Sequence, residues 1–358
     1  MNTPGNSADA NLEPIHELHF TRTNGAIDEL ADSLIRQAGG IRHAEVVRQM
    51  ILAALKAGQE NQGMADLKLM NSALKEMRFT SKVFTPYRHK KKIAVFGSAR
   101  VPPEAAPYKM ARTFGALAVR AGFMVITGGG GGIMQAVNEG AGPEHSFGVN
   151  IRLPFEQRAN HILEGSPRHI IYKYFFTRKV AFLKEAHGVV LFPGGLGTQD
   201  EAMETLTLVQ TGKHAPMPVV LLDEPGGEYW RDWQKFIRSG PLAHDYINPD
   251  DLALFSYTES TKSALAEIEN FYRCYHSIRY VDGELVMRLC APVSSEDLRR
   301  LSAEFSDMLI PGGAIHAMAA LPAEQDEPEI RHLPRLKIDF NKKKFGRLRQ
   351  FIDRLNGM

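Results

Sequence analysis

The stretch GVVLFPGGLGTQDE, residues 188–201, decides the fold of this chain. Its first five residues are apolar and indicate a buried strand, and a glycine-rich turn begins directly after them at Pro193. Apolar residues then recur at helical spacing from residue 201 to 212, so the stretch predicts a strand, a tight turn and a helix. A glycine turn at the start of a helix exposes free backbone N–H groups at the positive end of the helix dipole, which favours a phosphate site. The carboxylate of Glu201 lies close to this site and indicates chemistry on a phosphorylated substrate.

The alternation of strand and helix extends to both sides of this stretch. Short apolar segments that predict strands lie at residues 93–96, 123–126, 147–151, 189–192, 219–222 and 254–257. Helical patterns separate them, among them one predicted over residues 172–186. This alternation predicts an α/β fold with a doubly wound, Rossmann-like parallel sheet that is covered on both faces. In such sheets ligands bind beyond the carboxyl ends of the strands, which is where the glycine turns fall.

Extensions of different character flank this predicted sheet. Residues 26–84 carry apolar residues at helical spacing and predict a helical N-terminal extension for packing or oligomerisation. After residue 271, an Asp-Gly turn between two apolar segments predicts a hairpin. A helix, a strand and a basic terminal helix follow it, so we predict a small α+β C-terminal extension. We therefore divide the chain into a disordered N-terminus (1–14), a helical extension (15–90), a Rossmann-like catalytic domain (91–276) and the C-terminal extension (277–358).

Composition excludes several classes of protein. The net charge of the 358-residue chain is +2, which does not predict nucleic acid or an anionic membrane as a partner. No apolar run approaches the ~20 residues needed to span a bilayer, and the polar N-terminus does not resemble a signal peptide. Cys274 and Cys290 are the two cysteines, which excludes a disulfide scaffold and fits a reducing compartment. We therefore expect a cytoplasmic protein.

Three glycine-bearing turns fall at the ends of predicted strands, at residues 97–100, 127–132 and 194–198. Each alone could be an ordinary tight turn, but five consecutive glycines carry a high entropic cost that close approach to a ligand would offset. The hydroxyls of Ser98 and Thr198 suit phosphate oxygens. The turns match neither the G-x-G-x-x-G dinucleotide fingerprint nor the phosphate-binding loop of NTPases. No zinc-like spacing of His and Cys occurs either, so we predict no metal and no cofactor.

Two charged residues are candidates for the chemistry itself. Arg178 lies near the start of the predicted helix before the residue 189–192 strand, from which it could reach the same strand ends. Arginine binds phosphate in a bidentate manner, although a surface role would also explain it. Glu201 is the carboxylate next to the predicted phosphate site and is a candidate acid for chemistry there. Its alternative role is a favourable interaction with the helix dipole, worth about 0.3–1 kcal/mol.

The motif P-G-G-x-G-T-x-x-E at residues 193–201 resembles that of the Lonely Guy (LOG) family, often described as lysine-decarboxylase-like Rossmann proteins. Arg178-Lys179 and residues 96–99 and 127–134 share in the resemblance, which spans about residues 93–275. The resemblance implies hydrolysis of the N-glycosidic bond of nucleoside 5′-monophosphates to free base and ribose 5-phosphate. AMP and N6-modified cytokinin nucleotides are the best-known substrates of the family. The decarboxylase label would imply a pyridoxal phosphate lysine, and nothing in the sequence singles one out.

The resemblance also implies roles for individual residues. Arg178 and Glu201 would form the catalytic pair, and Glu204, one helical turn later, would support them. The substrate and its phosphate would contact Gly97, Ser98, Thr127, Gly128, Gly129, Gly130, Gly131, Met134, Lys179, Pro193, Gly194, Gly195, Gly197 and Thr198.

Two further expectations rest on relatives of this family. The extensions resemble those of longer bacterial members, which include nucleosidases of broad specificity, so we expect other purine or pyrimidine monophosphates as substrates too. We also expect a homo-oligomer, a dimer or larger. The alternative function is a non-catalytic nucleotide or molybdenum-cofactor carrier, because related P-G-G-x-G-T proteins include such carriers. The pairing of Arg178 with Glu201 favours the enzyme, since a binder has no need of an acid beside an anion.

Overall fold

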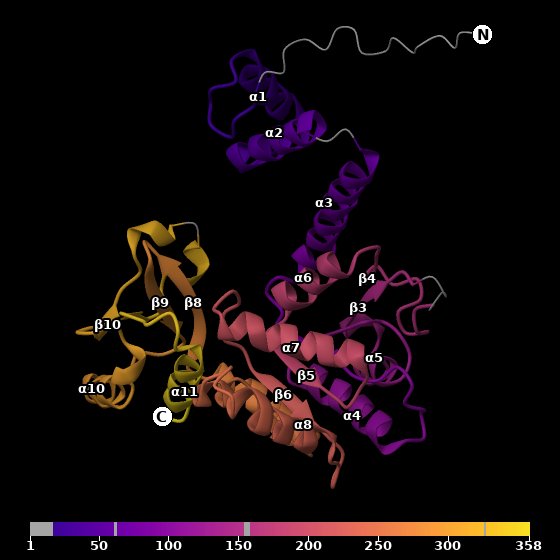
Figure 1. The fold of residues 1–358 in the computed structure, drawn as a ribbon, viewed down its shortest axis with the longest axis vertical. Helices are drawn as coiled ribbons and strands as arrows, with labels where there is room; N and C mark the ends of the chain where they lie inside the picture. Colours follow the sequence, from indigo (N-terminus) through magenta and orange to yellow (C-terminus); the bar gives the residue numbers. More distant parts are fainter. Residues whose placement is uncertain (1–16, 61–62, 154–157, 326) are drawn as a thin grey trace. The chain divides into compact units, whose positions relative to one another are not determined.

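The computed structural model of the protein describes residues 17–60, 63–153, 158–325 and 327–358 (Figure 1). The chain forms two compact units, Met1–Glu76 and Met77–Met358, which are described separately. The predicted disordered N-terminus lies outside the described residues. No helix among the described residues is long and apolar enough to cross a membrane.

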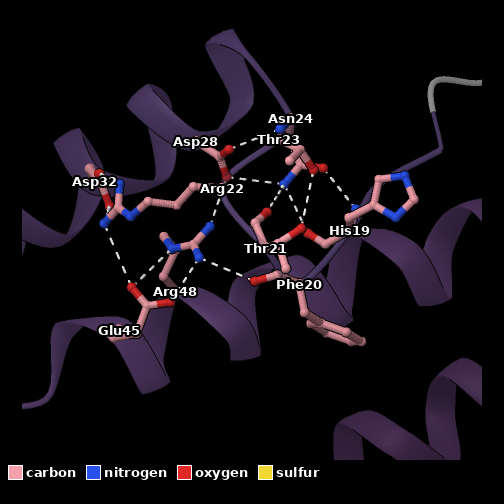
Figure 2. Close-up of polar contacts among 10 residues, drawn as sticks. All are labelled: His19, Phe20, Thr21, Arg22, Thr23, Asn24, Asp28, Asp32, Glu45 and Arg48. Carbon is pink, nitrogen blue, oxygen red and sulfur yellow. Dashed lines mark hydrogen bonds and ion pairs between the residues drawn. The ribbon is translucent and has the colours of Figure 1, made fainter.

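The first unit consists of helices, as predicted. They are α1 (Ala26–Ala38), α2 (Ala44–Glu60) and the first part of α3 (Met64–Phe84). Arg48 of α2 is buried and holds this unit together: its guanidinium donates to Asp28 at 2.7 Å, to Glu45 at 2.8 Å and to the Phe20 carbonyl at 3.2 Å (Figure 2). Asp28 in turn accepts from the backbone N–H of Asn24 at 2.9 Å, so the segment before α1 is fixed to both helices.

The second unit is built on a seven-stranded parallel sheet with the order β4-β3-β2-β1-β5-β6-β7. Its strands are β1 (Lys92–Phe96), β2 (Met124–Thr127), β3 (Ser146–Ile151), β4 (His169–Tyr172), β5 (Gly188–Leu191), β6 (Val219–Leu222) and β7 (Ser256–Thr258). Its helices are α4 (Ala106–Arg120), α5 (Ile133–Ala141), α6 (Phe175–Glu185), α7 (Leu196–Gln210), α8 (Tyr229–Ile237) and α9 (Thr261–Phe271). One face of the sheet packs against α4, α5 and α9, and the other packs against α6, α7 and α8. The predicted doubly wound α/β fold is confirmed.

The order of the strands reverses direction at the centre of the sheet. From β1 the chain builds outward through β2, β3 and β4, whereas from β5 it builds outward on the other side through β6 and β7. The loops that leave β1 and β5 therefore diverge to opposite faces, which opens a crevice between the carboxyl ends of these two neighbouring strands.

Two predicted boundaries in this unit are wrong. The helix predicted from residue 172 begins at Phe175 as α6, and β4 before it was not predicted, because this edge strand has only four residues and its alternating burial is too short a pattern to detect. Helix α7 begins at Leu196 rather than at the predicted residue 201. The extended residue Gly195 is its N-cap, so Gly197 and Thr198 lie in the first helical turn and Glu201 in the second.

The C-terminal part of this unit forms an antiparallel sheet with the order β10-β11-β9-β8. Its elements are β8 (Tyr275–Val281), β9 (Glu284–Leu289), α10 (Ser295–Glu304), β10 (Ile315–Met318), β11 (Arg335–Ile338) and α11 (Phe345–Asn356). The predicted hairpin is confirmed, since Asp282 and Gly283 both have positive φ in the turn between β8 and β9. The apolar face of α11 closes a core of its own over this sheet. β10 was not predicted.

Candidate active site at the carboxyl ends of β1 and β5

A cavity of about 590 Å³ lies at the point where the strand order reverses. It is open to solvent on one side and is bounded by the turns after β1 and β2, by α6 and by the start of α7. Its lining residues are Phe96, Gly97, Ser98, Ala99, Arg100, Gly128, Met134, Arg178, Gly195, Leu196, Gly197, Thr198 and Glu201. The structure therefore brings together nine of the sequence-predicted site residues and adds Phe96, Ala99, Arg100 and Leu196 to them.

The turns after β1 and β5 are in direct contact. The Ser98 N–H donates to the Pro193 carbonyl at 3.1 Å, and the hydroxyl of Tyr229, on α8, donates to the Gly194 carbonyl. A side chain at Gly194 would be impossible without movement, because its Cβ would lie 2.1 Å from Thr198 Oγ1 and 2.9 Å from the Ser98 nitrogen. Pro193 and Gly194 thus join the two turns and lie behind the cavity wall rather than in it.

The N-terminus of α7 opens directly onto the cavity. Gly195, Leu196, Gly197 and Thr198 line it in succession, while Glu201 follows one turn later. The first N–H groups of a helix have no partner within the helix, and the helix dipole places a partial positive charge there. This end of α7 can therefore bind an anion such as phosphate.

Glu201 and Arg178 form a buried pair at the side of this cavity. Glu201 is only 2% exposed, and its Oε1 lies 3.6 Å from Nη2 of Arg178. This separation exceeds hydrogen-bonding distance, and among the described residues neither Glu201 Oε2 nor Arg178 Nε has a hydrogen-bond partner. Both groups thus keep unused hydrogen-bonding capacity at the side of the cavity.

Burial shifts the protonation of both members of the pair. It raises the pKa of Glu201 above its ordinary value, although the positive charges of Lys179 and Arg178 oppose the rise. Burial also lowers the pKa of Arg178, against the effect of Glu201. Arg178 is further held by aromatic contacts, with its guanidinium carbon 5.4 Å from the ring centroids of both Phe175 and Phe182. A buried acid with a raised pKa beside a cation in a cleft is typical of catalytic sites.

Lys179 has a different place from the predicted one. Its ammonium lies 2.8 Å from Asp200, 2.6 Å from Glu204 and 3.7 Å from Glu201, and it is absent from the described cavity lining. Burial lowers the pKa of Lys179, but hydrogen bonds with Asp200 and Glu204 outweigh this effect and raise it. Because three carboxylates already occupy this cation, the prediction that it binds phosphate is not supported. Glu204 pairs with Lys179 and makes no ion pair with Arg178 in the part of the chain that the structure describes.

The glycine run after β2 serves mainly to pack one loop against another. Of the run, Gly128 lines the cavity together with Met134, whereas Gly132 has φ of 59° and packs against the Ser98 carbonyl. The Thr127 hydroxyl is fully buried, donates to Asn138 at 2.8 Å and accepts from the Gly129 N–H at 3.0 Å.

A second asparagine completes this internal framework. Asn160 donates from its backbone to the Gly129 carbonyl at 2.9 Å and from its side chain to the Gly130 carbonyl at 3.1 Å. The described cavity lining accordingly omits four of the predicted phosphate ligands, Thr127, Gly129, Gly130 and Gly131. Asn160 and Tyr229, which hold the glycine turns from outside, carry no local sequence signal that would single them out.

Known proteins resemble this region. The family model described as "Possible lysine decarboxylase" matches residues 121–268. The cytokinin riboside 5′-monophosphate phosphoribohydrolases LOG3 and LOG4 of Arabidopsis thaliana are each 25% identical over 159 residues, which cover 43% of this chain and 70% of each relative. These matches make residues 121–268 similar to the LOG family. Arg178 and Glu201 lie within the residues that the family model matches, while Gly97 and Ser98 precede them.

Among solved structures, the molybdenum cofactor binding protein of Rippkaea orientalis is 19% identical to this chain. The match covers 50% of this chain and 96% of that chain, with a TM-score of 0.36.

Proposed function

We propose that this protein hydrolyses the N-glycosidic bond of nucleoside 5′-monophosphates and releases the free base and ribose 5-phosphate. The observation that carries the proposal is the buried Glu201, whose Oε2 has no hydrogen-bond partner among the described residues, beside Arg178 in a cavity that an anion-binding helix end also lines. The phosphoribohydrolase names of LOG3 and LOG4 support the same class of reaction.

The arrangement along α7 suits a ribose phosphate. The 5′-phosphate would bind at the N–H groups of the first turn, with the hydroxyls of Ser98 and Thr198 as further donors. From Leu196 to Glu201 the helix advances about 7.5 Å, which leaves room for a ribose between the phosphate and the carboxylate. Glu201 would therefore lie on the side of the bond that breaks.

The chemistry requires that positive charge on the sugar be stabilised. Cleavage of a glycosidic bond passes through an oxocarbenium-like transition state, and a carboxylate close to the ribose stabilises it and orients the attacking water. Water supplies the hydroxyl group to C1′, and its proton leaves with the base. Arg178 would hold the phosphate or the ribose hydroxyls, since its Nε has no hydrogen-bond partner among the described residues.

The test is release of free base. The purified protein is incubated with AMP, GMP, CMP, UMP and an N6-modified adenosine monophosphate, and the products are separated by chromatography. We expect base from at least one monophosphate and at least 10²-fold less from E201Q and R178A, with E269Q, an exposed glutamate on α9, as the matched control that keeps full activity. Adenosine should react poorly because it lacks the phosphate.

Three results would contradict the proposal. Full activity of E201Q would remove Glu201 from the reaction, and equal rates for adenosine and AMP would remove the phosphate site. If no monophosphate released a base while AMP still bound, the protein would be a nucleotide-binding carrier instead.

A further inference from the structure

The two cysteines of the chain stand opposite each other at the start of the C-terminal sheet. The strands β8 and β9 pair Tyr275 with Leu289, and one residue outward the ladder brings Cys274 beside Cys290. The Cys290 N–H donates to the Cys274 carbonyl at 2.7 Å, so the two strands remain bonded at this position. We propose that Cys274 and Cys290 are a redox modification site, at which the two thiols join in a reversible intramolecular disulfide.

The register of the two strands favours this bond. Directly opposed residues of antiparallel strands have Cα atoms about 4.5–5.5 Å apart, within the range of about 4.4–6.8 Å that disulfides span. Opposed residues also project to the same face of the sheet. Tyr275 and Leu289 point into the core, at 2% and 0% exposure, whereas Cys274 is half-buried at the margin of this core and Cys290 is exposed.

The surroundings set the order of the reaction. Cys290 is exposed and Cys274 is half-buried, so an oxidant reaches Cys290 first. Burial raises the pKa of Cys274, with a further contribution from the nearby Cys290. Both sulfurs are free thiols in this structure.

The co-reactant is a low-molecular-weight disulfide such as oxidised glutathione. The Cys290 thiolate attacks one of its sulfurs, which forms a mixed disulfide and releases one molecule of glutathione. Cys274 then loses its proton and attacks Sγ of Cys290, which closes the protein disulfide and releases the second glutathione. The two cysteines are oxidised by two electrons, and oxidised glutathione is reduced by the same two.

The pair lies far along the sheet from the cavity. The segment before β8 contacts the amino end of β5 through Tyr272, whose hydroxyl donates to the His187 carbonyl at 2.7 Å. Lys91, just before β1, places its ammonium 4.0 Å from the centroid of the Tyr272 ring. The disulfide would therefore tie β9 to the connection between α9 and β8, at the amino end of the parallel sheet, whereas the cavity lies at the carboxyl ends.

The experiment equilibrates the full-length protein in glutathione buffers of increasing oxidised-to-reduced ratio, blocks free thiols with iodoacetamide and digests with trypsin. Cleavage after arginine places Cys274 in the peptide 274–279 and Cys290 in the peptide 289–299. We expect these two peptides to appear linked, as monomeric protein, in a proportion that rises with the oxidised glutathione and returns to zero with dithiothreitol.

Single variants separate the steps of the exchange. C274S should accumulate glutathione on Cys290, whereas C290S should react at least tenfold more slowly because Cys274 is half-buried. The proposal is overturned if both thiols remain alkylated in fully oxidised glutathione, if each carries glutathione without the linked peptide, or if the link joins two chains. None of these readouts depends on release of a base, so the failure of one proposal leaves the other standing.

Discussion

Replacement of Gly194 by alanine tests the contact between the turns after β1 and β5. The new Cβ would lie 2.1 Å from Thr198 Oγ1, 2.7 Å from Thr198 Cβ and 2.9 Å from the backbone nitrogen of Ser98. Rotation of the threonine side chain could relieve the first of these contacts but not the other two, so the backbone must shift by several tenths of an ångström. Overpacking of this kind costs about 1–3 kcal/mol, and each kcal/mol lowers the Tm of a unit of this size by roughly 2–4 °C.

Gly197→Ala is the matched control, three residues further along the chain. Its Cβ would meet no described atom within 4 Å, and alanine is favoured over glycine inside a helix by about 0.5–1 kcal/mol. We therefore expect G197A to be at least as stable as the wild type in thermal unfolding. It should nevertheless raise the KM for the monophosphate at least tenfold, because its methyl group would enter the cavity where the phosphate is proposed to bind.

Each of the two variants has its own outcome that would contradict the prediction. A Tm of G194A within 1 °C of the wild type would show that the two turns are not in contact as described. An unchanged KM for G197A would show that the phosphate lies away from the start of α7. Circular dichroism of both variants at 20 °C controls for loss of the fold.

Three further predictions concern charge. The acid limb of the pH–rate profile should lie above pH 4.5, because burial raises the pKa of Glu201. The ionised carboxylate stabilises the sugar cation, and this form is lost as the pH falls. A limb below pH 4.5 would contradict that role. K179M should move the same limb to still higher pH, since Lys179 opposes the rise, and a shift in Tm without a shift of the limb would make Lys179 purely structural. E324Q should destabilise the C-terminal sheet by about 3–5 kcal/mol, measured by hydrogen exchange. The reason is that Glu324 is 1% exposed and accepts hydrogen bonds from Arg288 at 2.7 Å and from Arg335 at 3.1 Å. A loss of stability below about 1 kcal/mol would refute this. Burial alone would raise the pKa of Glu324, but the hydrogen bonds lower it to about 2, so its contribution is full above pH 4.5 and disappears as the pH falls from 4.5 to 2.

Local patterns predicted most of this fold because apolar runs and turn residues act over short distances. The strand, turn and helix at residues 188–201 and the hairpin at Asp282-Gly283 are examples in which the signal and the structure occupy the same few residues. β4 was not predicted, because a four-residue strand at the edge of a sheet has almost no hydrophobic pattern in the sequence. The start of α7 was misplaced because Gly197 disfavours a helix by itself, whereas the packing of the turns sets where this helix begins.

The predicted site likewise contains residues that the sequence placed correctly and others that it did not. Arg178 and Glu201 meet in the structure, as expected for residues near the starts of the helices before and after the residue 189–192 strand. The glycine run was assigned to a ligand because its length has a high entropic cost, but part of that cost is offset by loop packing against Ser98 and Asn160. Such contacts join residues far apart in the sequence, so local patterns do not reveal them. The same holds for the ion pairs of Lys179, because its three carboxylate partners lie on α7.

The stacking of Arg178 on two phenylalanine rings has a consequence for affinity. An arginine that is free in solvent loses about 2 kcal/mol of rotational freedom when a ligand fixes it. Here the rings of Phe175 and Phe182, each centred 5.4 Å from the guanidinium carbon, already restrict the side chain before any ligand arrives. Most of this rotational freedom is therefore lost during folding and not on binding, which raises the affinity for a ligand by up to roughly 30-fold. Lysine at this position would keep the positive charge but give up this rigidity.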